Sequence, residues 1–348
     1  MIPAVASILR TGMVTPVGLG SEQTCLAIAA GVSAFAESSL CDRRFRPFVL
    51  ACLPDEALPE LRDEVVTPEL THRQRRLLQL ASSALEEALV GVPRTDRIPL
   101  FLSVPPGSGG HTSFMSAVFL DLLQRQLGAR LDVAGSRIFF QGRAGAMLAL
   151  QAAVACLHHG GVDRVLVGGV DTHLDPHVLG TLDLQRRVLS ASSRDGFVPG
   201  EAAAFLLLGS ASAGTGVAHL SEVTSALEPG HLGSEEPYLG DGLASAVTSA
   251  LRTLPSGHMI PTVYSSFNGE SHWGKEWGVA FLRSRPRFAE SHRLEHPADC
   301  VGDTGAAAGA VLLCLAAHDL RRGESGSSCL VWASSDGPER GVALLTRS

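Results

Sequence analysis

Basic side chains other than arginine are almost absent from this 348-residue sequence. Lys275 is the only lysine, against 27 arginines, since the chain has 28 basic residues in all. Acidic residues number 35, so the net charge is −7. A chain without a basic excess cannot neutralise many phosphates, and we therefore expect no nucleic-acid partner.

Paired cysteines are also lacking. The seven cysteines are an odd number and none has a Cys-x-x-Cys spacing, which argues against a disulfide framework and against a thiolate zinc site. Two histidines and two aspartates lie in 171–177, where a helix could bring His173 and His177 to one metal ion. Pro176 argues against such a helix, so we expect neither a metal nor a cofactor.

Long apolar runs are missing as well. No stretch of about 18 apolar residues is free of charges or turn residues, so no membrane span is expected. The first residues show no charged leader before an apolar stretch. The hydrophobic share of 45% and the mean hydropathy of +0.19 nevertheless exclude a disordered chain. Together these features predict a cytoplasmic protein with a deep core.

Two blocks of the sequence follow the same order of helix, strand and strand. Their helices are rich in alanine and apolar on nearly every side, and such helices must be buried on all sides. This pattern predicts an internal repeat and a layered α/β architecture with helices at its centre. The first block has a helix at 144–160 and strands at 163–171 and 202–210; the second has a helix at 304–320 and strands at 329–335 and 341–347.

The segments around these blocks are expected to be outer helices and loops. Helices over 21–35 and 71–89 carry polar faces, which is typical of a surface position. Loops are expected over 91–110, 186–200, 211–240 and 284–303.

Four segments, in matching order and spacing, resemble the β-ketoacyl synthases of the thiolase superfamily. The nearest match is RDGFVPGEAAAFLLL at 194–208, and the others lie at 11–35, 168–176 and 302–310. The resemblance implies the five-layered α/β/α/β/α thiolase fold, made of two similar halves. We place the N-terminal half, which is β-ketoacyl synthase N-terminal-like, at 1–212 and the C-terminal thiolase-like half at 213–348.

The resemblance also places the family's catalytic positions in this chain. The family condenses acyl units with a cysteine at the start of the first buried helix and with two histidines. Along the resemblance, the cysteine falls on Arg143 and the histidines fall on Asn268 and Asp303. Arginine keeps a pKa above ~12 and cannot act as a nucleophile. We therefore expect no condensation by the family's mechanism, and none of these three residues is assigned a catalytic role.

Other side chains offer weaker catalytic candidates. Cys300 lies in the loop that holds Asp303, and His272 follows Asn268 by four residues. A surface or loop position is the favoured interpretation for His272, and a displaced ligand-contacting residue is the alternative. Cys156 lies more than three helical turns from Arg143, roughly 20 Å at ~1.5 Å per residue, and is interpreted as a core residue.

The replacement residues are complementary in charge. A buried guanidinium without a partner is very costly, so Arg143 and Asp303 are expected to form a structural pair, with Asn268 hydrogen-bonded beside them. The alternative is a binding site in which Arg143, at the start of a helix, receives a carboxylate or phosphate.

The leading hypothesis is a catalytically degenerate β-ketoacyl synthase-like protein, similar to the chain length factors of type II polyketide synthases. It would serve as a non-catalytic partner subunit in fatty-acid or polyketide-type biosynthesis, as a homodimer or as a heterodimer with an active ketosynthase. The alternatives are an adaptor or chaperone that reuses the thiolase fold, and an acyltransferase with relocated catalytic residues. The basic stretch 71–76 is interpreted as a solvated helix face that could also dock an acyl carrier protein.

Overall fold

The computed structural model describes residues 2–107, 114–159, 161–191, 193–212 and 216–348. In these residues ten strands form one sheet, and two further strands form a separate hairpin. The first half contributes β1 (Ala6–Val14), β4 (Leu100–Ser103), β5 (Arg137–Phe139), β6 (Arg164–Thr172) and β7 (Glu201–Gly209). The second half contributes β8 (Ala218–Leu227), β9 (Ile260–Ser265), β10 (Phe288–Glu295), β11 (Ser328–Ser334) and β12 (Glu339–Thr346). The hairpin consists of β2 (Phe35–Cys41) and β3 (Pro47–Ala51).

The strand order repeats between the two halves. The whole order is β10-β9-β11-β12-β8-β1-β7-β6-β4-β5. Outward from the middle of the sheet, the first half reads β1-β7-β6-β4-β5 and the second half reads β8-β12-β11-β9-β10, which is the same relative order in the two halves. In both halves the inner pairings are antiparallel and the outer ones are parallel. The internal repeat predicted from the sequence is therefore present in the topology. The expected boundary between 212 and 213 falls at the edge of a gap, because Ala213 lies outside the described residues.

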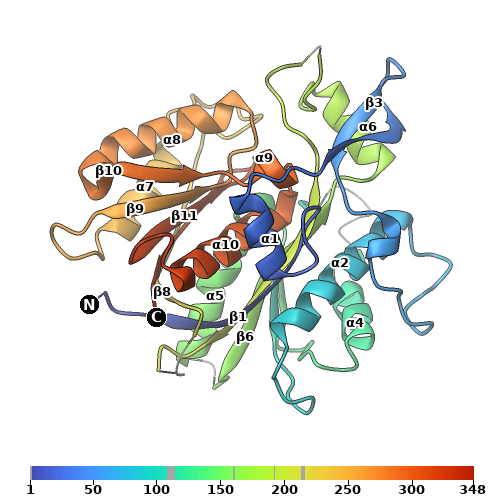
Figure 1. The fold of residues 1–348 in the computed structure, drawn as a ribbon, viewed down its shortest axis with the longest axis horizontal. Helices are drawn as coiled ribbons and strands as arrows, with labels where there is room; N and C mark the ends of the chain where they lie inside the picture. Colours follow the sequence, from blue (N-terminus) through green and yellow to red (C-terminus); the bar gives the residue numbers. More distant parts are fainter. Residues whose placement is uncertain (1, 108–113, 160, 192, 213–215) are drawn as a thin grey trace.

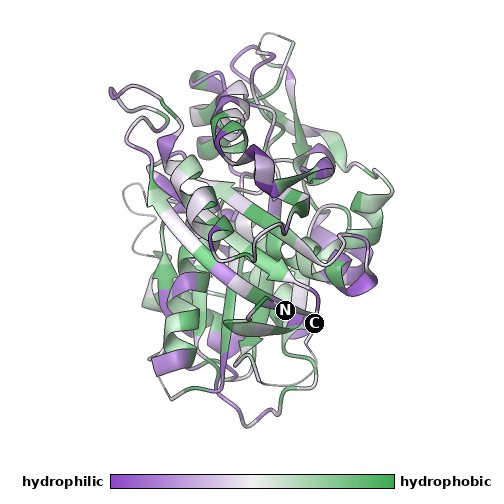
Figure 2. Ribbon diagram, turned by 90° about the vertical axis from the view of Figure 1, so that its left-hand side faces the viewer, coloured by the Kyte–Doolittle hydropathy of each residue, from purple (hydrophilic) through white to green (hydrophobic). Residues whose placement is uncertain are grey.

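Helices cover both faces of the two half-sheets and also separate them (Figures 1 and 2). Between the half-sheets, α5 (Gly145–His159) and α10 (Ala308–Arg322) pack against each other, and α10 touches strands of both halves. The outer layers are α2 (His72–Ala88) with α4 (Ala117–Gln126), and α7 (Asp241–Leu251) with α8 (Ser271–Ser284). Shorter helices are α1 (Ser21–Ala29), α6 (Pro176–Leu184) and α9 (Ala298–Val301). This is the five-layered α/β/α/β/α arrangement of the thiolase fold.

The two central helices are not buried to the same extent. Buried residues fill α10 from Gly309 to Ala317, as its apolar sequence predicts. Only the first half of α5 is buried, and from Val154 onward most of its side chains are half-exposed or exposed. The prediction of complete burial is therefore wrong for the second half of α5, where Ala155 is exposed and Val154 is only partly buried.

Three segments expected to be loops contain strands. The segment 91–110 contains β4, 211–240 contains β8, and 284–303 contains β10. The last two escaped detection because of their polar composition. In β8, polar side chains alternate with buried ones, and β10 is an edge strand whose side chains are mostly half-exposed or exposed.

The basic stretch 71–76 is not the solvated face that the sequence predicted. Arg76 is only 2% exposed, and its Nε and NH2 groups donate to the Glu201 carboxylate at 2.6 Å. Arg73 pairs with the buried Asp171 at 3.1 Å. Both arginines turn inward because α2 packs on β1 and β7, and Glu201 opens β7 as a fully buried carboxylate.

A substitution at Glu201 tests the weight of this buried pair. Glu201→Gln leaves the Arg76 guanidinium without its buried counter-charge, and we expect a loss of about 3–5 kcal/mol in the free energy of unfolding. Asp55 is the other acidic partner of Arg76, and the Asp55 side chain is 73% exposed. Asp55→Asn should therefore lower the free energy of unfolding by less than about 1 kcal/mol. Urea unfolding of both variants checks this, and equal losses would contradict it.

None of the helices in the described part of the chain is long and apolar enough to cross a membrane.

Candidate functional site

The site lies where the two central helices begin. A 3-10 turn over Gly142–Ala144 leads into α5, and a second one over Gly305–Ala307 leads into α10. Each turn opens with a glycine in the left-handed region, with φ of +58° at Gly142 and +51° at Gly305. A Cβ at Gly305 would lie 2.1 Å from the Asp171 carboxylate, so the chain needs glycine there. The two turns touch each other, which brings Arg143 and Asp303 together from opposite halves.

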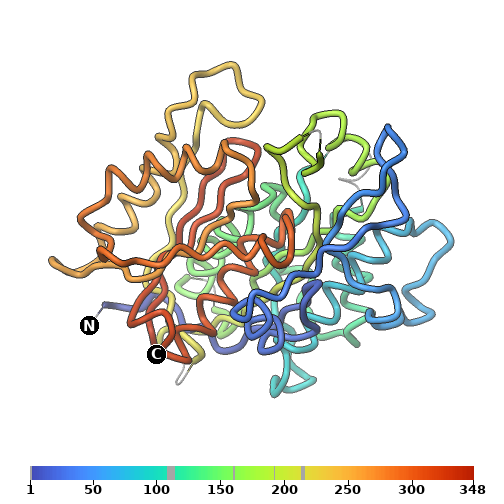
Figure 3. The backbone as a smooth tube through the Cα atoms, turned by 45° about the horizontal axis from the view of Figure 1, so that its top comes forward, coloured from blue at the N-terminus to red at the C-terminus, as the bar shows by residue number. Residues whose placement is uncertain are grey.

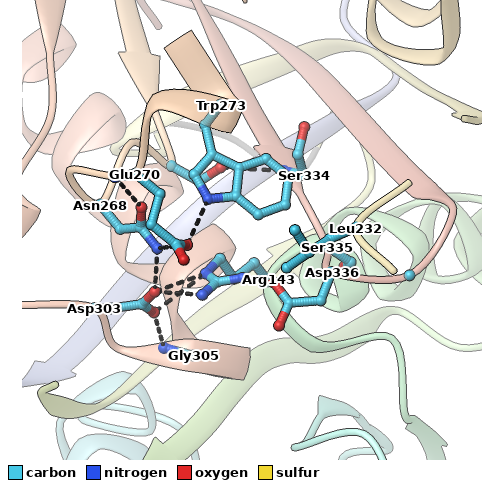
Figure 4. A network of polar contacts seen from close by, with 12 residues as sticks. Arg143, Leu232, Asn268, Glu270, Trp273, Asp303, Gly305, Ser334, Ser335 and Asp336 are labelled. Atoms are coloured by element: carbon cyan, nitrogen blue, oxygen red, sulfur yellow. Dashed lines mark hydrogen bonds and ion pairs between the residues drawn. The ribbon is translucent and has the colours of Figure 1, made fainter. Parts of the chain in front are cut away.

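Arg143 is locked by two carboxylates (Figure 4). Its Nε donates to both oxygens of Asp303, at 3.2 and 3.0 Å, and its NH2 group also contacts that carboxylate. Its NH1 group donates to Asp336 Oδ1 at 2.6 Å. Arg143 is 6% exposed and Asp303 is 3% exposed, so this pair is buried. All three nitrogens are thereby engaged, which favours the structural pair over a site for an external anion.

Asp303 has further hydrogen bonds, which complete its shell. Asn268 Nδ2 donates to Asp303 Oδ2 at 2.7 Å, and the backbone N–H of Gly305 donates to Oδ1 at 2.8 Å. The same Asn268 amide group donates to Glu270 Oε2 at 3.0 Å, and Trp273 Nε1 donates to that oxygen at 3.0 Å. The structure thus brings together the three residues that the sequence analysis singled out, in the hydrogen-bonded arrangement that it expected.

A second arginine closes the network. Arg187 donates to both oxygens of Glu270, at 2.7 and 2.8 Å, and its NH1 group donates to Asp336 at 2.6 Å. These contacts form a closed ring of six side chains. Around the ring the order is Arg143, Asp303, Asn268, Glu270, Arg187 and Asp336, and Asp336 returns to Arg143. Arg187, Glu270 and Asp336 were not identified from the sequence. For Asp336 the available signal was the charged turn between the two strands predicted at 329–335 and 341–347.

The pKa values of Asp303, Asp336 and the two arginines keep these four groups charged at neutral pH. Burial by itself would raise the pKa of Asp303, but the charge and hydrogen bonds of Arg143 outweigh it and lower that pKa to about 2. Burial is likewise outweighed at Asp336, whose pKa lies well below its usual value because of Arg143 and Arg187. The carboxylates in turn raise the pKa of both arginines above the usual range. Neither arginine can therefore act as a base.

Little space remains beside the pair. The cavity that Arg143, Asn268 and Asp303 line has a volume of about 20 Å³, which is room for about one water molecule. A larger cavity of about 440 Å³ lies on the other side of the ring, where it reaches Asp336. Its lining is mixed: Phe140 and other apolar side chains face several polar groups. An acyl chain has no room at Arg143 itself.

Cys300 and His272 are not assembled into a reactive pair. Burial raises the pKa of the Cys300 thiol, and Asp299 raises it further, so the thiolate is disfavoured. Cys300 lines a separate cavity of about 350 Å³, away from Arg143. His272 belongs to the first turn of α8, not to a loop, and stacks on Tyr238 at 4.0 Å between ring centroids. Among the described residues no hydrogen bond or shared cavity links the two side chains.

The polar groups of the segment 171–177 make structural hydrogen bonds within the fold. Asp175 caps α6 by accepting the backbone N–H groups of His177 and Val178. His173 Nδ1 lies 3.0 Å from the backbone oxygen of Asp303. Within the described parts of the chain, no group of three histidines, cysteines or carboxylates could hold a metal ion.

The substitution Arg143→Glu tests whether the pair is structural. It would set four carboxylates against one remaining arginine in a buried site, so the loss should exceed about 3 kcal/mol in the free energy of unfolding. The matched control is Arg94→Glu, an equal change of charge at an exposed position. Thermal melts measure both, and a variant at 143 as stable as the native chain would rule out the structural pair.

Acid sensitivity gives a second test. Asp303 has a folded pKa of about 2, below its ordinary 3.8, so its ionisation stabilises the fold above pH ~4. That contribution, roughly 2 kcal/mol, is lost as the pH falls from ~4 towards ~2. Urea unfolding at successive pH values should therefore show a shallower acid slope for Asp303→Asn than for the native chain. An identical slope would mean that Asp303 is not held by Arg143.

A comparison with protein-family models matches residues 133–213 to the β-ketoacyl synthase N-terminal domain. The matched segment contains all of α5, β6, α6 and β7, and both arginines of the ring, Arg143 and Arg187. A comparison with curated protein sequences gives no match.

Solved structures with the same fold include three ketosynthase assemblies. The ishigamide ketosynthase/chain length factor has a TM-score of 0.79 at 14% identity, covering 99% of this chain and 99% of that one. A type II polyketide synthase ketosynthase in complex with its acyl-carrier protein has 0.78 at 16%, with 99% and 99% covered. A ketosynthase in complex with its chain length factor, from Xenorhabdus doucetiae, has 0.77 at 18%, with 99% and 98% covered.

At these identities the likeness shows the fold. Residues 133–213 match the β-ketoacyl synthase N-terminal domain, and the chain as a whole has the fold of the ketosynthases.

Proposed function

We propose that the protein is a non-condensing partner subunit of an active β-ketoacyl synthase, in fatty-acid or polyketide-type biosynthesis. The observation that carries this proposal is the ring around Arg143. By resemblance the nucleophile belongs at that position, and here a guanidinium lies there, held by Asp303 and Asp336. A permanently charged arginine cannot form an acyl thioester, so any condensation would depend on another subunit.

Two kinds of observation support a paired subunit. Similar solved structures contain ketosynthases together with chain length factors. In this chain, β5 forms the edge of the sheet and carries the half-exposed Ile138 and Phe139. An edge strand with apolar side chains is a ready site for strand pairing with a second chain. The partner is an active ketosynthase in the favoured case and a second copy of this chain in the other.

The alternatives have less support. An acyltransferase with relocated residues needs a thiolate, and burial disfavours one at Cys300. A filled site would support an adaptor, and the site at Arg143 is nearly filled, since its cavity has only about 20 Å³. The open cavity of about 440 Å³ beside Asp336 favours the partner subunit, because a chain grown by the ketosynthase needs such a space.

The proposed setting is the cytoplasm, and the proposed units are the halves 1–212 and 213–348. All seven cysteines are free, and a reducing compartment suits free cysteines. Four of these thiols are buried, which protects them from oxidation.

The test begins with affinity capture of the tagged protein from its native host, read by mass spectrometry. We expect an active ketosynthase to be recovered, and the co-expressed pair to elute as one complex. The chain alone should form no carbon–carbon bond between an acyl thioester and a malonyl thioester, whereas the complex should, and replacing the ketosynthase's nucleophilic cysteine should abolish this condensation. Recovery of only the chain itself, or of proteins outside acyl metabolism, would overturn the proposal in favour of an adaptor.

Cysteine variants test the remaining alternative, an acyltransferase with relocated catalytic residues. If the chain alone transfers acyl groups, and Cys300→Ser abolishes this while the exposed Cys41→Ser does not, the relocated acyltransferase replaces our proposal. We expect both variants to behave like the native chain in the complex.

A further inference from the structure

The tip of the β2–β3 hairpin carries a cluster of positive charge on an acidic protein. Residues 42–46 read Asp-Arg-Arg-Phe-Arg, so three arginines stand against one aspartate, while the chain as a whole has a net charge of −7. The hairpin projects beside α6 at the upper right of Figures 1 and 3. At its tip, Phe45 is 91% exposed. A basic, aromatic tip is thus presented to the outside.

Hydrogen bonds around Asp42 hold this tip in one shape. Its carboxylate accepts the backbone N–H groups of Arg44, at 2.8 Å, and Arg46, at 3.0 Å, and also the Arg46 guanidinium. Backbone bonds from Asp42 to Arg46 and from Phe45 to Asp42 close the turn. Phe45 has a φ of +61°, in the left-handed region that bulky side chains rarely adopt. Among the described residues the Phe45 ring has no aromatic or cation–π partner, and it is exposed to solvent.

A groove lies between the hairpin and α6. It has a volume of about 480 Å³, and its apolar lining includes Leu40, Phe48 and Leu184, the last of which is 70% exposed. Arg43 reaches α6 through Asp183, with its Nε 3.5 Å from the carboxylate, while its side chain stays 51% exposed. The surface therefore combines an apolar floor with a basic rim.

The position of the groove connects it to the site already described. His177 and Thr181 of α6 line this groove and also the cavity of about 440 Å³ that reaches Asp336. A partner seated on the hairpin would consequently lie one helix away from that cavity.

We propose that the tip, comprising Arg43, Arg44 and Phe45 with Leu184 beside it, is a docking surface for an acidic protein. Arginines at a rim steer and orient an acidic surface, and an exposed aromatic side chain supplies the apolar anchor that such contacts need. Resting on the proposed function, this partner is the acidic acyl carrier protein that serves the ketosynthase. The stretch 71–76 cannot fill this role, because Arg73 and Arg76 are engaged inside the fold.

Two substitutions test the surface without disturbing the fold. Arg44→Glu reverses a charge whose side chain has no hydrogen bond or ion pair among the described residues. Phe45→Gly removes the ring and relieves the left-handed backbone, so the melting temperature should stay the same or rise. Arg94→Glu is the control, since it makes the same charge change on an exposed loop away from the hairpin.

The binding of the host's acyl carrier protein to the full chain is measured by titration at low and high salt. We expect salt-sensitive binding, about tenfold weaker for Arg44→Glu and for Phe45→Gly, and unchanged for Arg94→Glu. Equal binding by all variants, or no binding by the native chain, would overturn the docking surface. So would binding to phosphatidylserine-containing vesicles through Phe45 in place of the carrier protein, since the surface would then face a membrane. Co-elution with a ketosynthase is scored separately, so failure of either proposal is recognised by itself.

Discussion

The buried ion pair between Arg143 and Asp303 joins the two halves of this molecule at their centre. Each residue precedes one of the central helices, so the pair can form only when both half-sheets and both helices are in place. A guanidinium and a carboxylate at this depth are tolerated because each is satisfied by several hydrogen bonds. The surrounding loops follow from that requirement: Arg187 and Glu270 lie where they do because Asp336 and Asn268 need partners.

The same constraint explains why the site is closed. A pocket that holds two arginines and three carboxylates in mutual contact has little free volume, and the cavity at Arg143 accordingly fits about one water molecule. The neighbouring cavity beside Asp336 stays open because only the outer edge of the ring reaches it. The chain therefore combines a filled centre with an adjoining space. A subunit that shapes a cavity for chemistry done elsewhere fits this combination.

Much of this arrangement could be predicted from the sequence, for physical reasons. The apolar helix at 304–320 and its two strands were recognisable because a buried element leaves an uninterrupted apolar pattern, and complementary charge predicted the pair of Arg143 with Asp303. Polar segments were harder: β10 was missed because an edge strand needs no apolar pattern, and Arg76 was placed on the surface because its partner Glu201 is distant in sequence. Asp336 was missed because only the folded loop brings it to Arg143.

The two turns that open α5 and α10 have a further electrostatic consequence. Each helix start carries roughly half a positive charge from its aligned peptide dipoles, and both lie at this site. These two half-charges offset the one carboxylate that the two arginines leave uncompensated. At the start of a helix such a positive potential would favour a cysteine thiolate. In this chain the negative charge of Asp303 offsets that potential. A cysteine restored at position 143 alone would therefore meet a field cancelled by the protein's own carboxylate, and its thiol would stay protonated.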